Sequence, residues 1–338
     1  MLRGIQFRCV GAGLAALLLA APDAAEAQEY ELVLTSEAGD RNSVLGGAMR
    51  EWARLIEERS DGRIVADVFY QGELGGQQEV FDQLVRGNID LMITWPQTSY
   101  DERIGVSYIP YAVLNWEDAF AAYAGDGWLS ELSRPLYEDL GLHYFGPFPE
   151  GFGGIATQSE YAVTYEGASQ KGLKVRSQPI FPLPQAVSAM GFQAVPIDWN
   201  EVYTSIQTGV VDGDSSNVIY WDYEYFGDQL DYFVQSSHNF STYALLMNRE
   251  MWRELSEGDR GIIDGAAQEV IANQFEQARA EDQKWIEAAQ QDGMEYIEPT
   301  DDEMSAWVER VRSNVWPQIE ARLGSEIMDE VRANATTP

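Results

Sequence analysis

In the first part of the chain, segments whose apolar residues recur at helical spacing alternate with short segments that have the pattern of strands. Leu45, Met49, Trp52 and Ile56 recur at helical spacing and predict a helix. The expected elements, in order, are a strand at Tyr30–Leu34, a helix at Ser43–Arg59, a strand at Arg63–Tyr70, a helix at Glu79–Arg86 and a strand at Ile89–Ile93. This order predicts a mostly parallel sheet with helices on both faces.

The same alternation restarts near Gly151. The expected elements are a strand at Lys174–Val175, a helix at Pro182–Met190, a strand at Phe192–Val195, a helix at Trp199–Thr208 and a strand end at Val210–Asp212. After Met251 the pattern is nearly all helical, with helices at Arg260–Gln291 and Glu303–Leu323. At about 1.5 Å per residue, the first of these is long enough to run along both units.

The fold class that follows is α/β with two lobes. Each lobe is expected to hold a mixed, mostly parallel sheet flanked by helices, and a long helix spans both lobes. We assign residues 28–150 with about 241–275 to lobe I, and residues 151–240 with about 276–330 to lobe II. The chain is expected to cross between the lobes near Phe148–Gly151 and Asn239–Thr242, where a hinge would allow closure on a ligand.

The first 27 residues read as a secretory signal peptide. Arg3 and Arg8 precede the apolar stretch Val10–Ala21, and Ala25-Glu26-Ala27 fits a signal-peptidase site. A membrane anchor is the alternative, but an apolar run of about 12 residues is short against the roughly 20 needed to span a bilayer. The only cysteine, Cys9, lies in this segment. We therefore expect a soluble exported protein without disulfides.

Charge and motif content favour binding over catalysis. The formal net charge is -33, which argues against nucleic acid or anionic lipid as a partner. The chain contains no GxSxG, HExxH, GxxxxGK or GxGxxG motif. The two histidines, His143 and His238, are interpreted as structural. We expect no enzyme activity, no cofactor and no metal site.

A ligand pocket is expected at the carboxyl ends of the strands, where open α/β sheets bind their ligands. Arg176 directly follows the strand Lys174–Val175 and can offer a planar, charged fork to a carboxylate. The alternative is an ordinary solvated surface arginine. Several aromatic residues are candidate pocket walls or, alternatively, core residues: Trp95, Phe181, Trp199, Tyr220, Trp221 and Tyr223. The last three share one expected loop with Tyr225 and Phe226.

Four stretches of the chain together resemble the substrate-binding subunits of tripartite ATP-independent periplasmic (TRAP) transporters, the C4-dicarboxylate-binding protein family. The resemblance runs from about Glu29 to Leu323. The four stretches are Phe69–Gly75 with Val85–Asp90, then Ile109–Tyr111, then Lys171–Arg176, and last Met190–Pro196 with Trp199, Glu201–Tyr203 and Gln207–Gly213.

The resemblance implies a periplasmic protein that pairs a ligand carboxylate with Arg176 and uses Asn217 beside it. The chain departs from the family pattern in two places: Asp214-Ser215-Ser216 stands where a Gln-Glu pair is common, and Gly153 stands where many members have a second arginine. A ligand with one carboxylate, or a zwitterion, is therefore expected. The candidate ligand-binding residues are Arg176, Asn217, Trp221, Tyr220, Trp95, Phe181, Glu37 and Trp199.

The function expected from the resemblance is capture of a small organic anion and its delivery to TRAP membrane subunits. One alternative is a periplasmic sensor that presents an organic acid or an ectoine-like compatible solute to a receptor. The other is an enzyme that acts on an organic acid, which the missing motifs disfavour.

Overall fold

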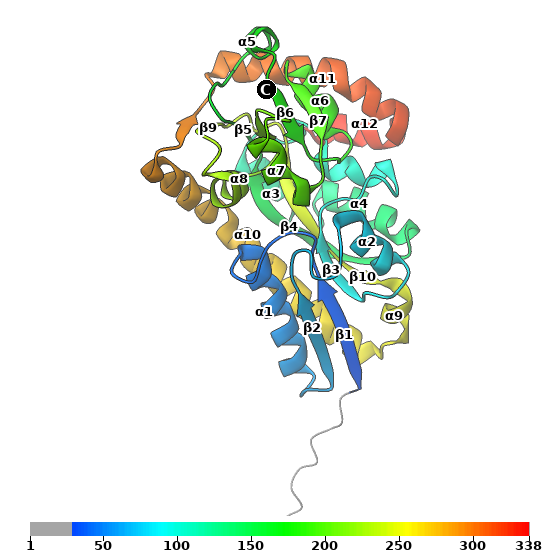
Figure 1. The fold of residues 1–338 in the computed structure, drawn as a ribbon. Helices are drawn as coiled ribbons and strands as arrows, with labels where there is room; N and C mark the ends of the chain where they lie inside the picture. The colour runs from blue at the N-terminus through cyan, green and yellow to red at the C-terminus, as the bar shows by residue number, and fades with distance from the viewer. Residues whose placement is uncertain (1–28, 338) are drawn as a thin grey trace, which may run out of the picture.

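The computed structural model describes residues 29–337, so the expected signal peptide at 1–27 lies outside the described residues. The chain builds two sheets, one above the other in Figure 1, with helices packed around both. The lower sheet has the strand order β2-β1-β3-β10-β4. Its strands are β1 (Tyr30–Thr35), β2 (Ile64–Phe69), β3 (Leu91–Thr94), β4 (Leu142–Phe152) and β10 (Phe240–Asn248).

The upper sheet has the strand order β11-β9-β5-β8-β6-β7. Its strands are β5 (Ile155–Thr157), β6 (Lys174–Ser177), β7 (Gln193–Pro196), β8 (Gly213–Ser215), β9 (Tyr232–Val234) and β11 (Glu295–Ile297). Both sheets are mixed. In the lower sheet β1 pairs parallel with β2 and β3, while β10 runs antiparallel to β3 and β4. In the upper sheet β6 pairs parallel with β7 and β8, while β5 runs antiparallel to β8 and β9.

The helices cover the two sheets and join them. Those of the first half are α1 (Val44–Arg59), α2 (Gln77–Val85), the 3-10 helix η1 (Glu102–Tyr108), α3 (Trp116–Tyr123) and α4 (Trp128–Asp139). Those around the upper sheet are α5 (Tyr165–Lys171), α6 (Leu183–Ala189), the 3-10 helix η2 (Trp199–Glu201), α7 (Val202–Gln207) and α8 (Ile219–Phe226). The C-terminal half adds α9 (Arg249–Glu254), α10 (Glu257–Asp292), α11 (Asp301–Leu323) and α12 (Ser325–Asn334).

Helix α10 is the long helix expected from the sequence, and it runs beside both sheets in Figure 1. Its 36 residues correspond to about 54 Å of helix. The Ser256 hydroxyl accepts the N–H of Asp259 at the N-terminus, and Gly293 ends the helix with φ of 104°. Along its length α10 contacts β4 and α1 and then α8, so it ties the two sheets together.

Strands β4 and β10 are the continuous connection between the two halves. They pair antiparallel from Leu142 opposite Asn248 to Phe152 opposite Phe240, with register shifts between Ser241 and Thr242 and between Leu245 and Leu246. The two crossing segments expected from the sequence fall within this pair or at its edge. The division of the chain into residues 28–150 with 241–275 and residues 151–240 with 276–330 remains a prediction.

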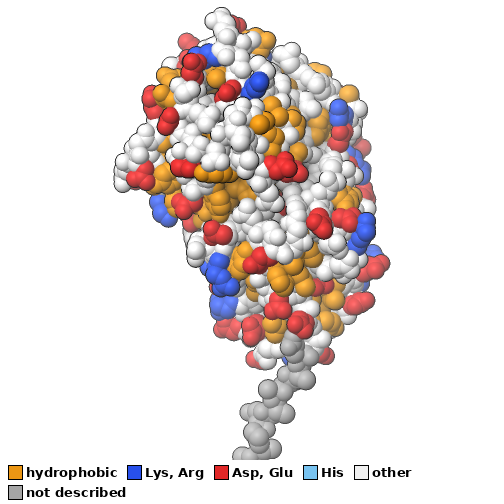
Figure 2. Space-filling model, viewed as in Figure 1, with side chains coloured by type: hydrophobic (Ala, Val, Ile, Leu, Met, Phe, Trp, Pro, Cys, Tyr) orange, Lys and Arg blue, Asp and Glu red, His pale blue; other side chains and the backbone are white. Residues whose placement is uncertain are grey.

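One expected loop is a helix instead. Tyr220, Trp221, Tyr223, Tyr225 and Phe226 belong to α8. Its side chains are apolar nearly all round, so it lacks the alternation of polar and apolar positions that marks an amphipathic helix. In Figure 2 hydrophobic side chains are exposed at the waist of the molecule, in the region where Figure 1 places α8 and α10. Within residues 29–337, none of the helices is both long enough and apolar enough to cross a bilayer.

Candidate functional site

The centre of the site is a buried ion pair between two neighbouring strands of the upper sheet. Strands β6 and β8 are parallel, and their register places Arg176 beside Asp214. Arg176 Nη1 lies 3.2 Å from Asp214 Oδ1 and 3.4 Å from Oδ2. Arg176 Nε donates to the carbonyl of Ile197 at 2.8 Å. Both side chains are fully buried, so Arg176 is not the solvated surface arginine that was the alternative interpretation.

Asn217, two residues after the end of β8, completes this network. Its Nδ2 donates to Asp214 Oδ2 at 2.7 Å, and its Oδ1 accepts from Gln178 Nε2 at 2.6 Å. The predicted pair of Arg176 and Asn217 is therefore brought together, with Asp214 between them. Gln178 was not among the candidates, although it lies only two residues after Arg176.

A second carboxyl group, that of Asp222 on α8, also lies in this region. It is fully buried, and burial raises its pKa well above the ordinary value, with the nearby negative charge of Asp214 adding to the effect. Burial also raises the pKa of Asp214, while Arg176 opposes that rise. We infer that Asp222 keeps its proton and that Asp214 is the anionic partner of Arg176.

Three tryptophans meet where the two sheets face each other. Trp95 follows β3 of the lower sheet, whereas Trp199 and Trp221 belong to the upper half. The ring centroids of Trp95 lie 5.9 Å from those of Trp199 and 6.1 Å from those of Trp221. Trp199 lies beneath Arg176, with 6.0 Å from the guanidinium carbon to its ring. Tyr243 of β10 stacks on Trp95 at 5.0 Å.

Tyr220 lies at the outer edge of this aromatic cluster. Its ring centroid is 4.8 Å from that of Trp221 and 4.8 Å from that of Trp285 on α10. It was predicted as a pocket wall, and its position on the side of α8 that meets α10 places it beside the predicted residue Trp221.

Two carboxylates of the lower half approach the tryptophans. Glu37 follows β1 and is 2% exposed. Its Oε1 accepts a hydrogen bond from the N–H of Trp95 at 2.8 Å and from the Thr94 hydroxyl at 2.9 Å. Its Oε2 has no hydrogen-bond partner among the described residues. Burial raises the pKa of Glu37 to about 7, and the nearby charge of Glu150 adds to this.

Glu150 of β4 connects the two halves of the aromatic cluster. Its Oε1 accepts from Trp221 Nε1 at 2.6 Å, and its Oε2 accepts from the Ser241 hydroxyl at 2.6 Å and from Trp95 Nε1 at 3.4 Å. Burial raises the pKa of Glu150, and these hydrogen bonds partly offset the rise. Glu150 was not predicted as a site residue. The one sequence feature that could have marked Glu150 is that it is the single acidic residue in the largely apolar segment Leu142–Phe152.

Phe181 is the one candidate that the structure places apart. Its backbone N–H donates to the Thr98 hydroxyl at 2.9 Å, and its ring lies 4.9 Å from the guanidinium carbon of Arg322. It belongs to a different hydrophobic cluster from that of Trp95, Trp199 and Trp221.

The two histidines occupy different environments. Both ring nitrogens of the fully buried His238 bond serine hydroxyls, Ser216 at 2.9 Å and Ser236 at 2.8 Å. His143 stacks on Trp252 with 3.9 Å between ring centroids. These contacts fit the structural interpretation. Across residues 29–337 no group of three or more His, Cys, Asp or Glu side chains is arranged to hold a metal.

Comparison with known proteins agrees with this architecture. Residues 35–322 match the family model DctP, described as bacterial extracellular solute-binding protein, family 7. The chain is 23% identical over 335 residues to the ectoine-binding periplasmic protein TeaA of Halomonas elongata, which covers 96% of this chain and 94% of that protein. It is 24% identical over 330 residues to the C4-dicarboxylate-binding periplasmic protein DctP of Rhodobacter capsulatus, with 96% of each chain covered.

Solved structures share the fold. A TRAP periplasmic solute-binding protein from Sulfurospirillum deleyianum with bound succinate superposes with a TM-score of 0.81 at 19% identity, covering 90% of this chain and 99% of that one. The ectoine-binding protein of the Halomonas elongata TeaABC transporter gives a TM-score of 0.81 at 21% identity, covering 90% and 98%. These structural matches confirm the expected two-lobed fold. The match to the family model confirms the expected periplasmic location and a role in solute binding. The chain belongs to the DctP family of TRAP periplasmic solute-binding proteins.

Proposed function

We propose that this protein captures a small organic solute with a single carboxylate, including zwitterions, and delivers it to the membrane subunits of a TRAP transporter. The observation that carries the proposal is the geometry of Arg176. Its Nε and Nη1 are occupied by Ile197 and Asp214, whereas its Nη2 makes no hydrogen bond within residues 29–337. One guanidinium nitrogen is therefore left for a ligand oxygen.

The charges around Arg176 favour one carboxylate over two. Asp214 already forms an ion pair with the guanidinium, and Glu37 and Glu150 bond the tryptophans of the facing side. A second ligand carboxylate would meet buried acids without a compensating cation, which is costly in a region that excludes water. Relatives carry names with different ligands, ectoine for TeaA and C4-dicarboxylates for DctP, so the family alone does not decide the ligand.

Calorimetric titration with three probes tests the proposal: the zwitterion ectoine, the monoanion D-erythronate and the dianion succinate. We expect ectoine or D-erythronate to bind at least tenfold more tightly than succinate. Tightest binding by succinate, or binding by none of the three, contradicts the proposal. The recovered ligand should be chemically unchanged by mass spectrometry. Uptake into vesicles that contain the cognate membrane subunits should require the protein.

A further inference from the structure

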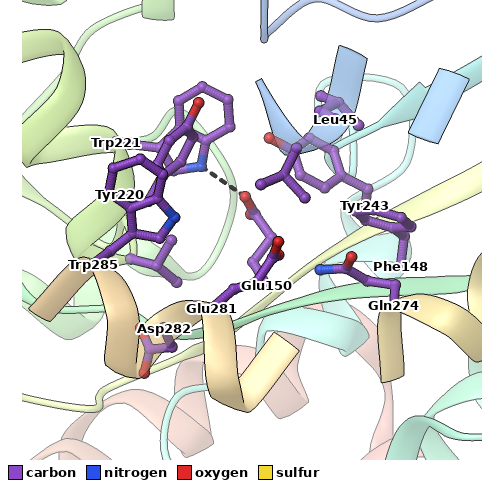
Figure 3. Close-up of a pocket in the computed structure, with 12 residues that line it drawn as sticks. Leu45, Phe148, Glu150, Tyr220, Trp221, Tyr243, Gln274, Glu281, Asp282 and Trp285 are labelled. Atoms are coloured by element: carbon purple, nitrogen blue, oxygen red, sulfur yellow. Dashed lines mark hydrogen bonds between the residues drawn. The ribbon is translucent and has the colours of Figure 1, made fainter. Parts of the chain in front are cut away.

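The turn between β8 and α8 carries much of the Arg176 network within a few residues. Asp214 lies in β8, and Asn217 lies two residues after the end of that strand. Helix α8 begins shortly after the turn, and it places Trp221 against Glu150 of β4, as Figure 3 shows. The backbone of this turn therefore sets the positions of several candidate ligand-binding residues at once.

Ser216, in the middle of the turn, has an unusual backbone conformation. Its φ is 76°, in the left-handed region that a residue with a side chain adopts at a cost in free energy. Its N–H donates to the carbonyl of Gly154 at 2.9 Å, and its carbonyl accepts from Asn239 Nδ2 at 3.1 Å. Gly154 also donates its N–H to the carbonyl of Asn217 at 2.8 Å. The turn is thus held by the segments that adjoin the ends of β4 and β10.

The side chain of Ser216 bonds a histidine from one of these segments. Its hydroxyl oxygen lies 2.9 Å from His238 Nε2, and the hydroxyl of Ser236 lies 2.8 Å from His238 Nδ1. All three residues are fully buried, and within residues 29–337 neither hydroxyl has another hydrogen-bond partner. Burial lowers the pKa of His238 to about 3, so the ring is neutral, and one nitrogen donates while the other accepts.

The glycine at position 153 belongs to the same arrangement. A Cβ atom on Gly153 would lie 2.8 Å from the carbonyl oxygen of Ser216, and it would also overlap Oδ1 of Asn239. Because interiors are close-packed, a larger residue at this position would displace the turn. Gly153 and Ser216 both lie where the sequence departs from the family pattern, and the structure brings the two departures into contact.

We propose that Ser216 and His238 are positioning residues for solute binding, because their hydrogen bond holds the turn in the left-handed conformation that presents Asn217 to Asp214 and Arg176. Neither residue touches the solute in this proposal. A binding residue is held in its productive orientation by the packing and hydrogen bonds of its neighbours. The inference rests on the proposed function, in which Arg176 holds the carboxylate.

A matched pair of serine variants tests the proposal. Ser216→Ala and Ser236→Ala each remove one buried hydroxyl that is bonded to the same imidazole, so a purely structural role predicts equal effects on binding. Calorimetry uses the tightest-binding member of the ectoine, D-erythronate and succinate panel. We expect Ser216→Ala to bind about tenfold more weakly than the wild type and Ser236→Ala to stay within about threefold of it, because only Ser216 belongs to the turn.

Two variants of His238 provide a conservative rescue, and they decide the question if Ser216→Ala does not fold. The glutamine amide in His238→Gln reaches the place of Nε2 and can keep a bond to Ser216. The shorter asparagine amide in His238→Asn reaches only the place of Nδ1, beside Ser236. We expect His238→Gln to bind the solute at least about threefold more tightly than His238→Asn.

Hydrogen exchange of the ligand-free protein gives a readout that needs no solute. The Ser216 N–H, which donates to Gly154, should exchange at least about fivefold faster when the turn loses its tie to His238. The comparison is made on a peptide that covers residues 213–218. We expect faster exchange in Ser216→Ala and His238→Asn than in Ser236→Ala and His238→Gln, respectively.

Equal affinities within the folded pairs overturn the inference and leave the proposed function intact. If none of the three solutes binds the wild-type protein, the proposed function fails, and the exchange rates alone decide the role of the turn. Faster exchange in Ser216→Ala than in Ser236→Ala then supports the positioning role, and equal rates overturn it.

Discussion

Arg176 Nη1 lies 3.2 Å from Asp214 Oδ1 with both side chains buried, so the arginine expected to meet the ligand is already paired within the protein. The pairing changes the role of Arg176. It contributes to the folded structure as well as to the ligand site, because removing one member leaves the other charged and buried.

Removal of either partner should therefore destabilise the protein. We expect Arg176→Ala or Asp214→Ala to lower the free energy of unfolding by about 3–5 kcal/mol, because an unpaired buried charge remains. The double variant Arg176→Ala with Asp214→Ala should lose less than the sum of the two single variants. Urea denaturation of the four proteins measures this coupling. Additive losses would show that the pair has no energetic coupling.

Stability should also depend on the ionisation of Glu37. Burial raises the pKa of the Glu37 carboxyl to about 7 in the folded protein, compared with an ordinary pKa of 4.5. The folded state therefore binds more protons than the unfolded state in this range, and ionisation of Glu37 imposes a penalty on the free energy of unfolding. The penalty is absent below pH 4.5, grows between pH 4.5 and 7, and is complete above pH 7.

Glu37→Gln removes that penalty. We expect the variant to gain stability relative to the wild type as the pH is raised from 4.5 to 8, by at most about 3 kcal/mol. Glu309→Gln, with its exposed side chain, should show no such trend. A stability difference between Glu37→Gln and wild type that is flat across this pH range would contradict the raised pKa.

The hydrogen bond from Trp221 to Glu150 should contribute to both stability and binding. Trp221→Phe keeps an aromatic ring but loses the N–H that lies 2.6 Å from Glu150 Oε1. We expect a loss of about 1–3 kcal/mol in unfolding free energy, because a buried carboxylate loses a donor. Tyr220→Phe changes a neighbouring aromatic residue without removing a donor to Glu150 and is the control. Equal stability of the two variants would contradict the role of this bond.

Ligand binding should bring the lobes together. Trp95 of the lower half contacts Trp199 and Trp221 of the upper half, and these contacts require the halves to be close. Small-angle scattering should show a smaller radius of gyration with saturating ligand than without it. An unchanged scattering profile at saturation would count against closure.

Several of the helices were predictable from periodicity, because each has one face in the core. The helix expected at Arg260–Gln291 is α10 at Glu257–Asp292, and the expected helix Ser43–Arg59 is α1 at Val44–Arg59. The long pair β4 and β10 was not foreseen, since strands buried on both faces show no alternation.

The site was predictable only in part. Arg176 lies within β6 and Asn217 lies just after β8, and their proximity depends on those strands being neighbours, as the parallel α/β pattern implies. The sequence also marked Asp214 as unusual, but its pairing with Arg176 depends on side-chain directions within the sheet. Glu150 comes from a strand of the other sheet, and no local pattern connects it with Trp221.

The most direct test of the account is calorimetric titration of Arg176→Lys with the tightest-binding member of the ectoine, D-erythronate and succinate panel. Lysine keeps the charge beside Asp214 but loses the planar fork that can serve Asp214 and a ligand oxygen together. The account predicts a loss of about 2–5 kcal/mol in binding free energy, or roughly 30- to 4000-fold in affinity, with an unchanged circular dichroism spectrum. Wild-type affinity in the folded variant would contradict it, because the ligand carboxylate would then not be held by Arg176.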